Sequence, residues 1–278
     1  MQSLKTNLTV DLVLVIPVYN FETGIGQTLE KIKTWVIEIK DQKVQVIFSD
    51  DGSTDQTLKQ LKEFQVSNST WCELVENSTN SGKGMAVRLG FKRAKAFHPK
   101  YIFYTDCDLH YGLRIILERL LPELTHSDVV MVDRSWVMST RKKPAFVRKL
   151  ASGVFKRMAS VLSGVSYLDT QAGLKGFSAK VSNPIFDLLT LSGFTFDVEI
   201  LSIATYYRLR IKVVSIEFES VCKFPLHSSV MLLQNSLSMT ADLCRINWNW
   251  KAGRYFSREL QNRIDQEVYC IKKEESKF

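Results

Sequence analysis

From Val44 to Asp55 the chain reads VQVIFSDDGSTD. The first part of this stretch, Val44–Phe48, is apolar and rich in β-branched residues, which indicates a strand buried on both faces. The second part carries acidic, glycine and hydroxyl residues, which suit a tight turn followed by a helix start. A buried strand that ends in a polar turn before a helix is typical of a parallel α/β sheet.

The same alternation runs through the first half of the chain. Further strands are predicted at Leu12–Val18, Tyr101–Thr105 and Val129–Val132. Helical spacing of apolar residues predicts helices at Ile25–Ile39, Thr54–Phe64 and Lys83–Ala96. Parallel sheets bind ligands at the carboxyl ends of their strands, and three strands here end in polar groups: Tyr19-Asn20, Asp50-Asp51 and Asp106 with Asp108.

The second half of the chain is less regular. We predict helices at Ala145–Leu162 and Phe194–Tyr207, a strand at Ile211–Phe218, and a polar, glycine-containing loop at Asp169–Phe177. Residues 230–278 are predicted to be mostly helical. This pattern suggests a tail at residues 1–9, one α/β domain at 10–225 and a C-terminal helical extension at 226–278.

Composition narrows the class of protein. The chain has 278 residues, 45% of them hydrophobic, enough for one substantial core. Its longest apolar run, Leu12–Tyr19, is far shorter than the roughly 20 residues that a membrane helix needs, and the first residues lack an apolar signal core. Five cysteines without a paired spacing suit a reducing compartment. We therefore expect a cytoplasmic protein.

Positive charge is concentrated in one segment. The formal net charge is +8, and residues 134–168 hold eight Lys and Arg residues but no Asp or Glu. Such a segment predicts an anionic partner: a membrane surface, a phosphate group or nucleic acid. No known nucleic-acid-binding motif accompanies it, so we expect no nucleic-acid partner. A solvated helix face is the simpler explanation for part of this charge.

Two short motifs could carry chemistry. Asp106 and Asp108 follow a predicted strand, where alternate carboxylates repel each other unless a cation lies between them. Carboxylate oxygens favour Mg²⁺ or Mn²⁺, although an isolated pair of this kind is common in loops. Asn80–Gly84 precedes a helix and could approach a phosphate, or could be a simple turn. Asp51, the second acid of its turn, could accept a hydrogen bond from a nucleobase.

Taken in order, these motifs resemble family 2 glycosyltransferases, which use the GT-A fold. The resemblance extends over roughly residues 10–220 and rests on Val15–Asn20, Asp50–Asp55, Asn80–Gly84 with Arg88, and Asp106-Cys107-Asp108. It implies an inverting transfer from a nucleotide sugar on a Rossmann-like, mostly parallel sheet.

A second set of motifs is similar to one subgroup, the polyprenyl-phosphate sugar transferases that include dolichyl-phosphate glucosyltransferases. These motifs are Asp169–Phe177, Phe196–Glu199 and Val132–Arg134. Ala172 stands where the subgroup usually has cysteine, and the membrane helices common among its members are not visible. The resemblance favours UDP-glucose as the donor, with GDP-mannose as the next choice.

The resemblance also implies roles for individual residues. The base and ribose would lie among Pro17, Tyr19, Glu22 and Asp51, with Lys83 near the nucleotide or its phosphates. Asp106 and Asp108 would hold Mg²⁺ or Mn²⁺ on the diphosphate. The sugar would face Asp169 and Gln171, and Glu199 would support the site.

The acceptor decides which further groups are needed. A lipid phosphate is already ionised and needs cations rather than a general base, and Arg134 and Arg148 are the candidates for binding it. With the basic segment around them, this predicts a peripheral enzyme on the cytosolic face of a membrane that acts on a polyprenyl phosphate. The alternatives are an enzyme that glycosylates a sugar or protein hydroxyl, and an inactive nucleotide-sugar-binding module.

Overall fold

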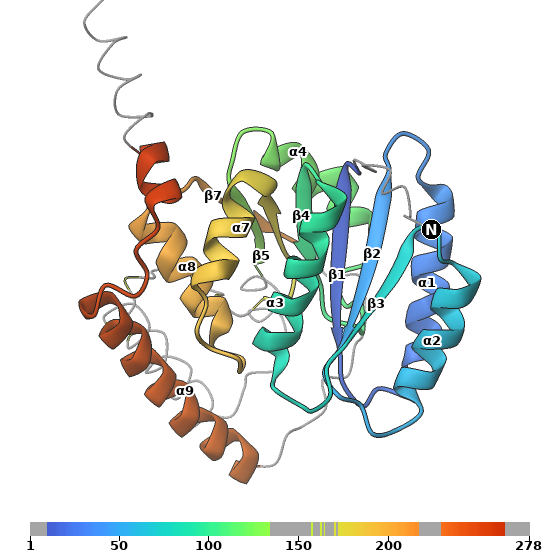
Figure 1. Cartoon of the computed structure of the whole chain (residues 1–278), viewed down its shortest axis with the longest axis horizontal. Coiled ribbons are helices and arrows are strands. Elements are labelled where there is room, and N and C mark those ends of the chain that lie inside the picture. Colours follow the sequence, from blue (N-terminus) through green and yellow to red (C-terminus); the bar gives the residue numbers. More distant parts are fainter. Residues whose placement is uncertain are drawn as a thin grey trace, which may run out of the picture.

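The computed structural model describes residues 10–133, 172–216 and 229–264, together with Arg157, Leu162, Gly164 and Thr170; for residues 229–237 it describes the backbone only. The chain forms one seven-stranded sheet with helices on both faces (Figure 1). The strands are β1 (Leu12–Val18), β2 (Val44–Asp50), β3 (Cys72–Glu76), β4 (Tyr101–Tyr104), β5 (Val129–Asp133), β6 (Lys175–Ser178) and β7 (Ile211–Ser215).

The helices follow the strands in the predicted alternation. They are α1 (Ile25–Glu38), α2 (Thr57–Ser67), α3 (Lys83–Ala94), α4 (Leu121–Leu124), α7 (Ala179–Leu188), α8 (Phe196–Tyr206) and α9 (Ser229–Lys251). A short 3₁₀ turn, η1 (Lys95–Phe97), extends α3, and a π-helical segment, η2 (Ile116–Leu120), precedes α4.

The sheet is mostly parallel. Its order is β3-β2-β1-β4-β6-β5-β7, and only β6 runs antiparallel to its neighbours β4 and β5. The four strands β3, β2, β1 and β4 are parallel, so their carboxyl ends meet at one edge. This edge is where the sequence predicts the ligand site.

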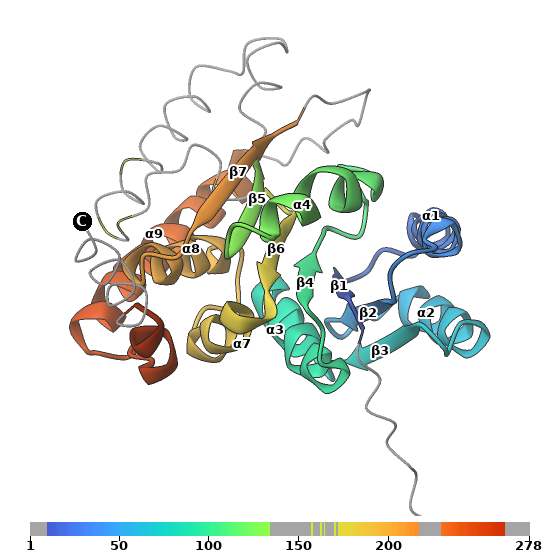
Figure 2. The same cartoon turned by 90° about the horizontal axis from the view of Figure 1, so that it is seen from above.

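The core lies on both faces of the sheet. Along β1, Val13 and Val15 point into one apolar cluster, whereas Leu12, Leu14 and Ile16 point into the other. This alternation explains why β1 reads as a continuous apolar run. Figure 2 shows α1 and α4 on one side of the sheet and α3 and α7 on the other.

Several predicted boundaries need correction. The predicted loop Asp169–Phe177 contains the start of β6, and α7 follows that strand directly. The helix predicted from Thr54 begins at Thr57, because Asp55 uses its carboxylate to accept the Thr57 N–H at 2.9 Å. β3 was not predicted.

Some predicted segments cannot be compared. The predicted helix Ala145–Leu162 lies almost entirely outside the described residues, and so do the tail at 1–9 and the last part of the predicted strand Ile211–Phe218. In the parts of the chain that are described, no helix has the length and apolar character that a membrane crossing requires. The described cysteines, Cys72, Cys107 and Cys244, are free thiols.

Candidate active site

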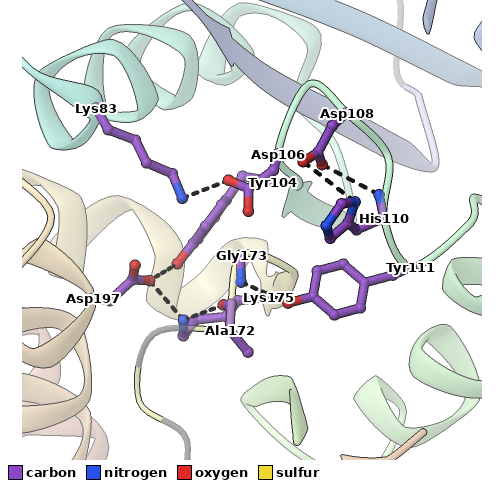
Figure 3. A network of polar contacts seen from close by, with 10 residues as sticks. All are labelled: Lys83, Tyr104, Asp106, Asp108, His110, Tyr111, Ala172, Gly173, Lys175 and Asp197. Atoms are coloured by element: carbon purple, nitrogen blue, oxygen red, sulfur yellow. Dashed lines mark hydrogen bonds and ion pairs between the residues drawn. The ribbon is translucent and has the colours of Figure 1, made fainter. Parts of the chain in front are cut away.

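Asp106 and Asp108 lie in a turn directly after β4, at the carboxyl edge of the sheet. The Leu109 N–H donates to the Asp106 carbonyl at 3.1 Å, and Leu109 adopts a left-handed conformation, with φ of 52°. This turn brings His110 back toward Asp108: its backbone N–H and its Nδ1 each lie 3.3 Å from an Asp108 carboxylate oxygen. Figure 3 shows both carboxylates on the same turn.

The Asp106 carboxylate pairs with Lys83. Lys83 is the first residue of α3, and its Nζ lies 2.5 Å from Asp106 Oδ1 (Figure 3). Gly82 directly precedes it with φ of 98°, a conformation that favours glycine. Two motifs that lie far apart in the sequence, Asn80–Gly84 and Asp106 with Asp108, are therefore joined by an ion pair.

Gly173 packs against the Asp106 carboxylate oxygen that does not contact Lys83. A Cβ at position 173 would lie 1.8 Å from Asp106 Oδ2, so any residue other than glycine would have to displace this carboxylate or the loop. The Gly173 N–H also donates to the Tyr111 hydroxyl at 3.2 Å. The predicted sugar-facing loop thus packs directly on the predicted metal site.

Asp108 lies close to two other titratable side chains, His110 and Asp106. Burial raises the pKa of Asp108 above its ordinary value, the neighbouring His110 lowers it, and the negative charge of Asp106 raises it again. Two carboxylates that repel each other in a partly buried turn favour a cation between them.

These carboxylates fit Mg²⁺ or Mn²⁺. Both supply hard oxygen donors, and such ions are usually held by one or two carboxylates together with substrate phosphates. Within the described ranges, no three His, Cys, Asp or Glu side chains are grouped closely enough to hold a metal ion. A metal bound here would therefore share its coordination with substrate or water.

Asp51 organises the turn that leads into α3. The residue is 3% exposed, and its carboxylate accepts hydrogen bonds from the Ser81 N–H at 2.9 Å, the Gly82 N–H at 2.7 Å and the Asn77 side chain at 3.2 Å. Asp51 therefore has a structural role that its place in the Asp50–Asp55 turn did not indicate. Its predicted contact with a nucleobase stays a prediction.

Residues 17–22 lie beside the same turn. Pro17 is buried within β1, opposite Ser49, whereas Tyr19 is 44% exposed just beyond the end of the strand. Glu22 accepts the Gln56 N–H at 3.0 Å, so its carboxylate helps to begin α2. The structure brings these residues close to Asp51, and their roles in donor binding stay predictions.

Glu199 is buried and already occupied by protein donors. Its oxygens accept from the Thr190 N–H and hydroxyl, at 2.9 and 2.7 Å, from the Leu191 N–H at 2.9 Å, and from the Tyr255 hydroxyl at 2.6 Å. The neighbouring Ser192 carbonyl accepts the Gly84 N–H at 2.7 Å. Glu199 therefore orders the loop that supports the first turn of α3.

Four predicted site residues lie outside the described residues: Asp169, Gln171, Arg134 and Arg148. Conversely, three residues without a predicted role contact this region: Tyr111, His110 and Lys175. Only the position of His110, two residues after Asp108, could have drawn attention to it. Lys175 gave no signal beyond its place in the Asp169–Phe177 motif.

Residues 13–182, more than half of the chain, match the model of the family described as Glycosyl transferase family 2. The chain belongs to glycosyl transferase family 2. It is therefore an enzyme of the glycosyltransferase class, as the order of its motifs predicted.

Two curated relatives match most of the chain. The dolichyl-phosphate beta-glucosyltransferase of Saccharomyces cerevisiae is 29% identical over 261 residues, which cover 87% of this chain and 75% of that protein. The dolichyl-phosphate beta-glucosyltransferase of Dictyostelium discoideum is 26% identical over 251 residues, which cover 86% and 75%.

Solved structures share the fold. The glucosyl-3-phosphoglycerate synthase of Mycobacterium tuberculosis, in complex with Mn²⁺, UDP-glucose and phosphoglyceric acid, matches with a TM-score of 0.60 and 19% identity. The match covers 86% of this chain and 80% of that one. The α/β sheet described above is therefore GT-A-like, as predicted.

Proposed function

We propose that this glycosyltransferase moves glucose from UDP-glucose to a polyprenyl phosphate, with inversion at the anomeric carbon and with Mg²⁺ or Mn²⁺ as cofactor. The observation that carries the proposal is the meeting of Lys83, Asp106 and Gly173 at the carboxyl edge of the sheet. In this proposal Lys83 neutralises phosphate charge, Asp106 binds the metal, and Gly173 brings the sugar-facing loop against the Asp106 carboxylate.

In this proposal, each part of the site binds a different portion of the donor. Pro17, Tyr19, Glu22 and Asp51 would border the base and ribose, and Lys83 would approach the phosphates. Asp106 and Asp108 would hold the metal, which when bound neutralises charge on the departing diphosphate. The sugar would face Asp169 and Gln171, and Glu199 would act from behind the loop as a supporting residue.

The lipid-phosphate acceptor is supported by the state of the carboxylates. A hydroxyl acceptor needs a general base, whereas a phosphate monoester is already ionised. Among the described carboxylates of this region, Asp51, Asp197 and Glu199 are each bound by protein donors, and this proposal assigns Asp106 and Asp108 to the metal. Two relatives over most of the chain are named dolichyl-phosphate beta-glucosyltransferase, which supports the same acceptor and glucose as the sugar.

The basic segment supports a membrane location. Residues 134–168 carry eight positive charges, and each Lys or Arg near an anionic surface contributes about 1 kcal/mol of binding. Arg134 and Arg148 would bind the acceptor phosphate, and Lys142 and Lys143 would contact the membrane. Together these interactions would hold the enzyme reversibly on the cytosolic face of a membrane.

A donor-by-acceptor screen tests the reaction. Purified enzyme is given UDP-glucose or GDP-mannose, with a short polyprenyl phosphate or the matching free polyprenol, in Mg²⁺, Mn²⁺ or EDTA. We expect metal-dependent transfer from UDP-glucose to the phosphate and a β-linked product by NMR. Faster transfer to a free hydroxyl than to any lipid phosphate would overturn the acceptor, and preference for GDP-mannose would overturn the donor.

Vesicle flotation tests the location. We expect the enzyme to float with anionic vesicles at low salt and to detach as salt rises, because exposed charges are screened. Replacing Lys142 and Lys143 by Ala should weaken flotation while leaving turnover on a short soluble acceptor nearly unchanged. Replacing Arg134 or Arg148 by Ala should raise the acceptor KM. No binding to anionic vesicles at low salt would contradict the membrane location.

A further inference from the structure

Lys175, Asp197 and Tyr104 form a buried polar network directly beneath the loop that packs on Asp106 (Figure 3). The Lys175 Nζ donates to Asp197 Oδ1 at 2.6 Å and to the Ala172 carbonyl at 2.7 Å. The Tyr104 hydroxyl donates to the same Asp197 oxygen. Lys175 and Tyr104 are completely buried, and Asp197 is 2% exposed.

Stability alone does not account for a charged pair in this position. Lysine is almost never fully buried unless it is paired, and apolar side chains of similar volume often stabilise a core at least as well as a buried ion pair. What an apolar side chain could not supply is the hydrogen bond from Lys175 to the Ala172 carbonyl. The network therefore gives this carbonyl a fixed, buried donor.

The other two members hold that donor in place. Asp197 lies in the first turn of α8, where the positive end of the helix dipole favours its negative charge. Tyr104 is fully buried, and its hydroxyl donates to the Asp197 carboxylate from the end of β4. Asp197 is thus bound by two donors from two strands, β6 and β4.

The network is connected to Asp106 by two short routes. Along the loop, Gly173 follows Ala172. Its backbone lies so close to Asp106 that a Cβ at this position would overlap Oδ2. Along β4, Tyr104 is the last residue of the strand and stands two positions before Asp106. A shift of the Ala172 carbonyl would therefore move the surface against which the Asp106 carboxylate rests.

We propose that Lys175, Asp197 and Tyr104 are positioning residues, which hold the Ala172-Gly173 backbone against Asp106 and so fix the orientation of this carboxylate toward the donor diphosphate. This inference rests on the proposed role of Asp106 in the transfer reaction. It assigns a function to the Lys175 end of the Asp169–Phe177 motif, to which the sequence gave no role.

The central test removes the network without leaving a buried charge. The triple variant Tyr104→Phe/Lys175→Met/Asp197→Leu keeps the core apolar and leaves the Ala172 carbonyl without its donor. We expect a cooperative thermal transition, a UDP Kd in Mn²⁺ within about threefold of the original, and a kcat reduced by roughly 10- to 100-fold, because small misplacements at a reacting centre are costly. A folded triple variant with an unchanged kcat would overturn the proposal.

Hydrogen exchange provides a readout that needs no substrate. We expect the Gly173 and Leu174 amides to exchange at least about tenfold faster in the triple variant, because local opening controls exchange and the loop has lost an anchor. Unchanged exchange at both amides would also overturn the proposal. If the original enzyme transfers no sugar from any donor, the proposed function fails, and the exchange result still decides whether the network positions the loop.

Two further variants complete the test. Tyr104→Phe removes one hydrogen bond and keeps the ion pair, so it should fold even if the triple variant does not. We expect it to lower kcat severalfold with the UDP Kd unchanged, and an unchanged kcat would count against the proposal. Lys95→Met is the matched control, since it removes a lysine that pairs with Asp187 at 2.8 Å on the surface, and we expect it to alter neither exchange nor kcat.

Discussion

At the scale of single residues, the centre of the site is the contact between Gly173 and Asp106. The Asp106 carboxylate has Lys83 on one oxygen and the Gly173 backbone against the other. Each neighbour restricts the carboxylate in a different way, one by charge and one by shape. Its orientation is therefore determined by residues 23 positions before it and 67 positions after it in the chain.

We predict that Gly173→Ala lowers kcat by roughly 10- to 100-fold, because the new Cβ must displace the Asp106 carboxylate or the loop. Such overpacking should also reduce the free energy of unfolding by about 1–3 kcal/mol. Steady-state kinetics and urea unfolding measure both effects. The control is Gly26→Ala in α1, where a Cβ would meet nothing within 4 Å; it should leave kcat unchanged. Wild-type kinetics in Gly173→Ala would show that this contact is unimportant.

We predict that Asp108→Ala abolishes turnover and leaves the fold intact. Its side chain is 44% exposed, and its interactions are confined to the local turn, so little packing is lost. Removing one of the two carboxylates should uncouple the metal from the diphosphate. Kinetics in Mn²⁺ and a melting curve test this, with Asp187→Ala as a control for loss of an exposed acid. Near wild-type activity of Asp108→Ala in EDTA would exclude a role in metal binding.

At the scale of elements, the first turn of α3 is held from two sides. Asp51, at the end of β2, binds the N–H groups of Ser81 and Gly82, while the Ser192 carbonyl binds the N–H of Gly84. A Cβ at Gly82 would lie 2.5 Å from this carbonyl. These contacts fix the start of α3 and hence the direction of the Lys83 side chain. Its amino group is thereby placed beside the Asp106 carboxylate.

We predict that Asp51→Ala weakens nucleotide binding and also destabilises the protein by about 2 kcal/mol, the order of magnitude for hydrogen bonds to a buried charged acceptor. The turn loses the acceptor of two backbone N–H groups, so Lys83 loses its fixed position. The effects of Asp51→Asn should be smaller than those of Asp51→Ala, because one acceptor oxygen remains. Urea unfolding and calorimetry with UDP measure the effects. An unchanged free energy of unfolding would show that water replaces these bonds at no cost.

At the scale of the whole molecule, the C-terminal segment is packed into the same core as the sheet. Leu243, Ile246, Tyr255 and Leu260 belong to the apolar cluster that contains Val13 and Val15 of β1. Tyr255 also donates to Glu199, and the Arg263 guanidinium contacts Asp128 at the start of β5. The boundary predicted at residue 226 stays a prediction, but the described residues beyond it contribute to the support of the site.

We predict that Asp128→Asn lowers the free energy of unfolding at pH 7 by about 1.5–3 kcal/mol, through loss of charged hydrogen bonds to Arg210 and Arg263. Burial alone would raise the pKa of Asp128, but the Arg210 N–H and the Arg263 guanidinium lower it below its ordinary value of 3.8. This stabilisation is therefore complete above pH 3.8 and is lost as the pH falls through the lower, folded value.

Urea unfolding across this pH range checks the sign of the effect. The difference between the original protein and Asp128→Asn should be constant at neutral pH and shrink below pH 3.8. Asp187→Asn, which weakens the exposed pair with Lys95, should change stability little at any pH. A difference at Asp128 that grew on acidification would contradict the lowered pKa.

Local patterns along the chain are enough to predict most of the strands, the turns and the class of fold. Apolar runs such as Leu12–Val18 are typical of strands buried on both faces of a parallel sheet, and turns such as Asp50–Asp55 combine residues that end strands and begin helices. The resemblance carried by these motifs predicted the family, and the apolar run before Asp106 and Asp108 placed them at the end of a strand. These patterns can be recognised in the sequence because the spacing of residues along a strand or helix follows from backbone geometry alone.

Which residues distant in sequence come into contact depends on the packing of the whole chain. β6 has four residues, begins with a buried lysine, and forms because β4 and β5 supply hydrogen bonds on both its edges. No local pattern indicates that Lys175 pairs with Asp197, that Glu199 accepts from Tyr255, or that Gly173 touches Asp106. Such contacts depend on where the sheet places chain segments far apart in sequence, and burial then makes each polar partner obligatory.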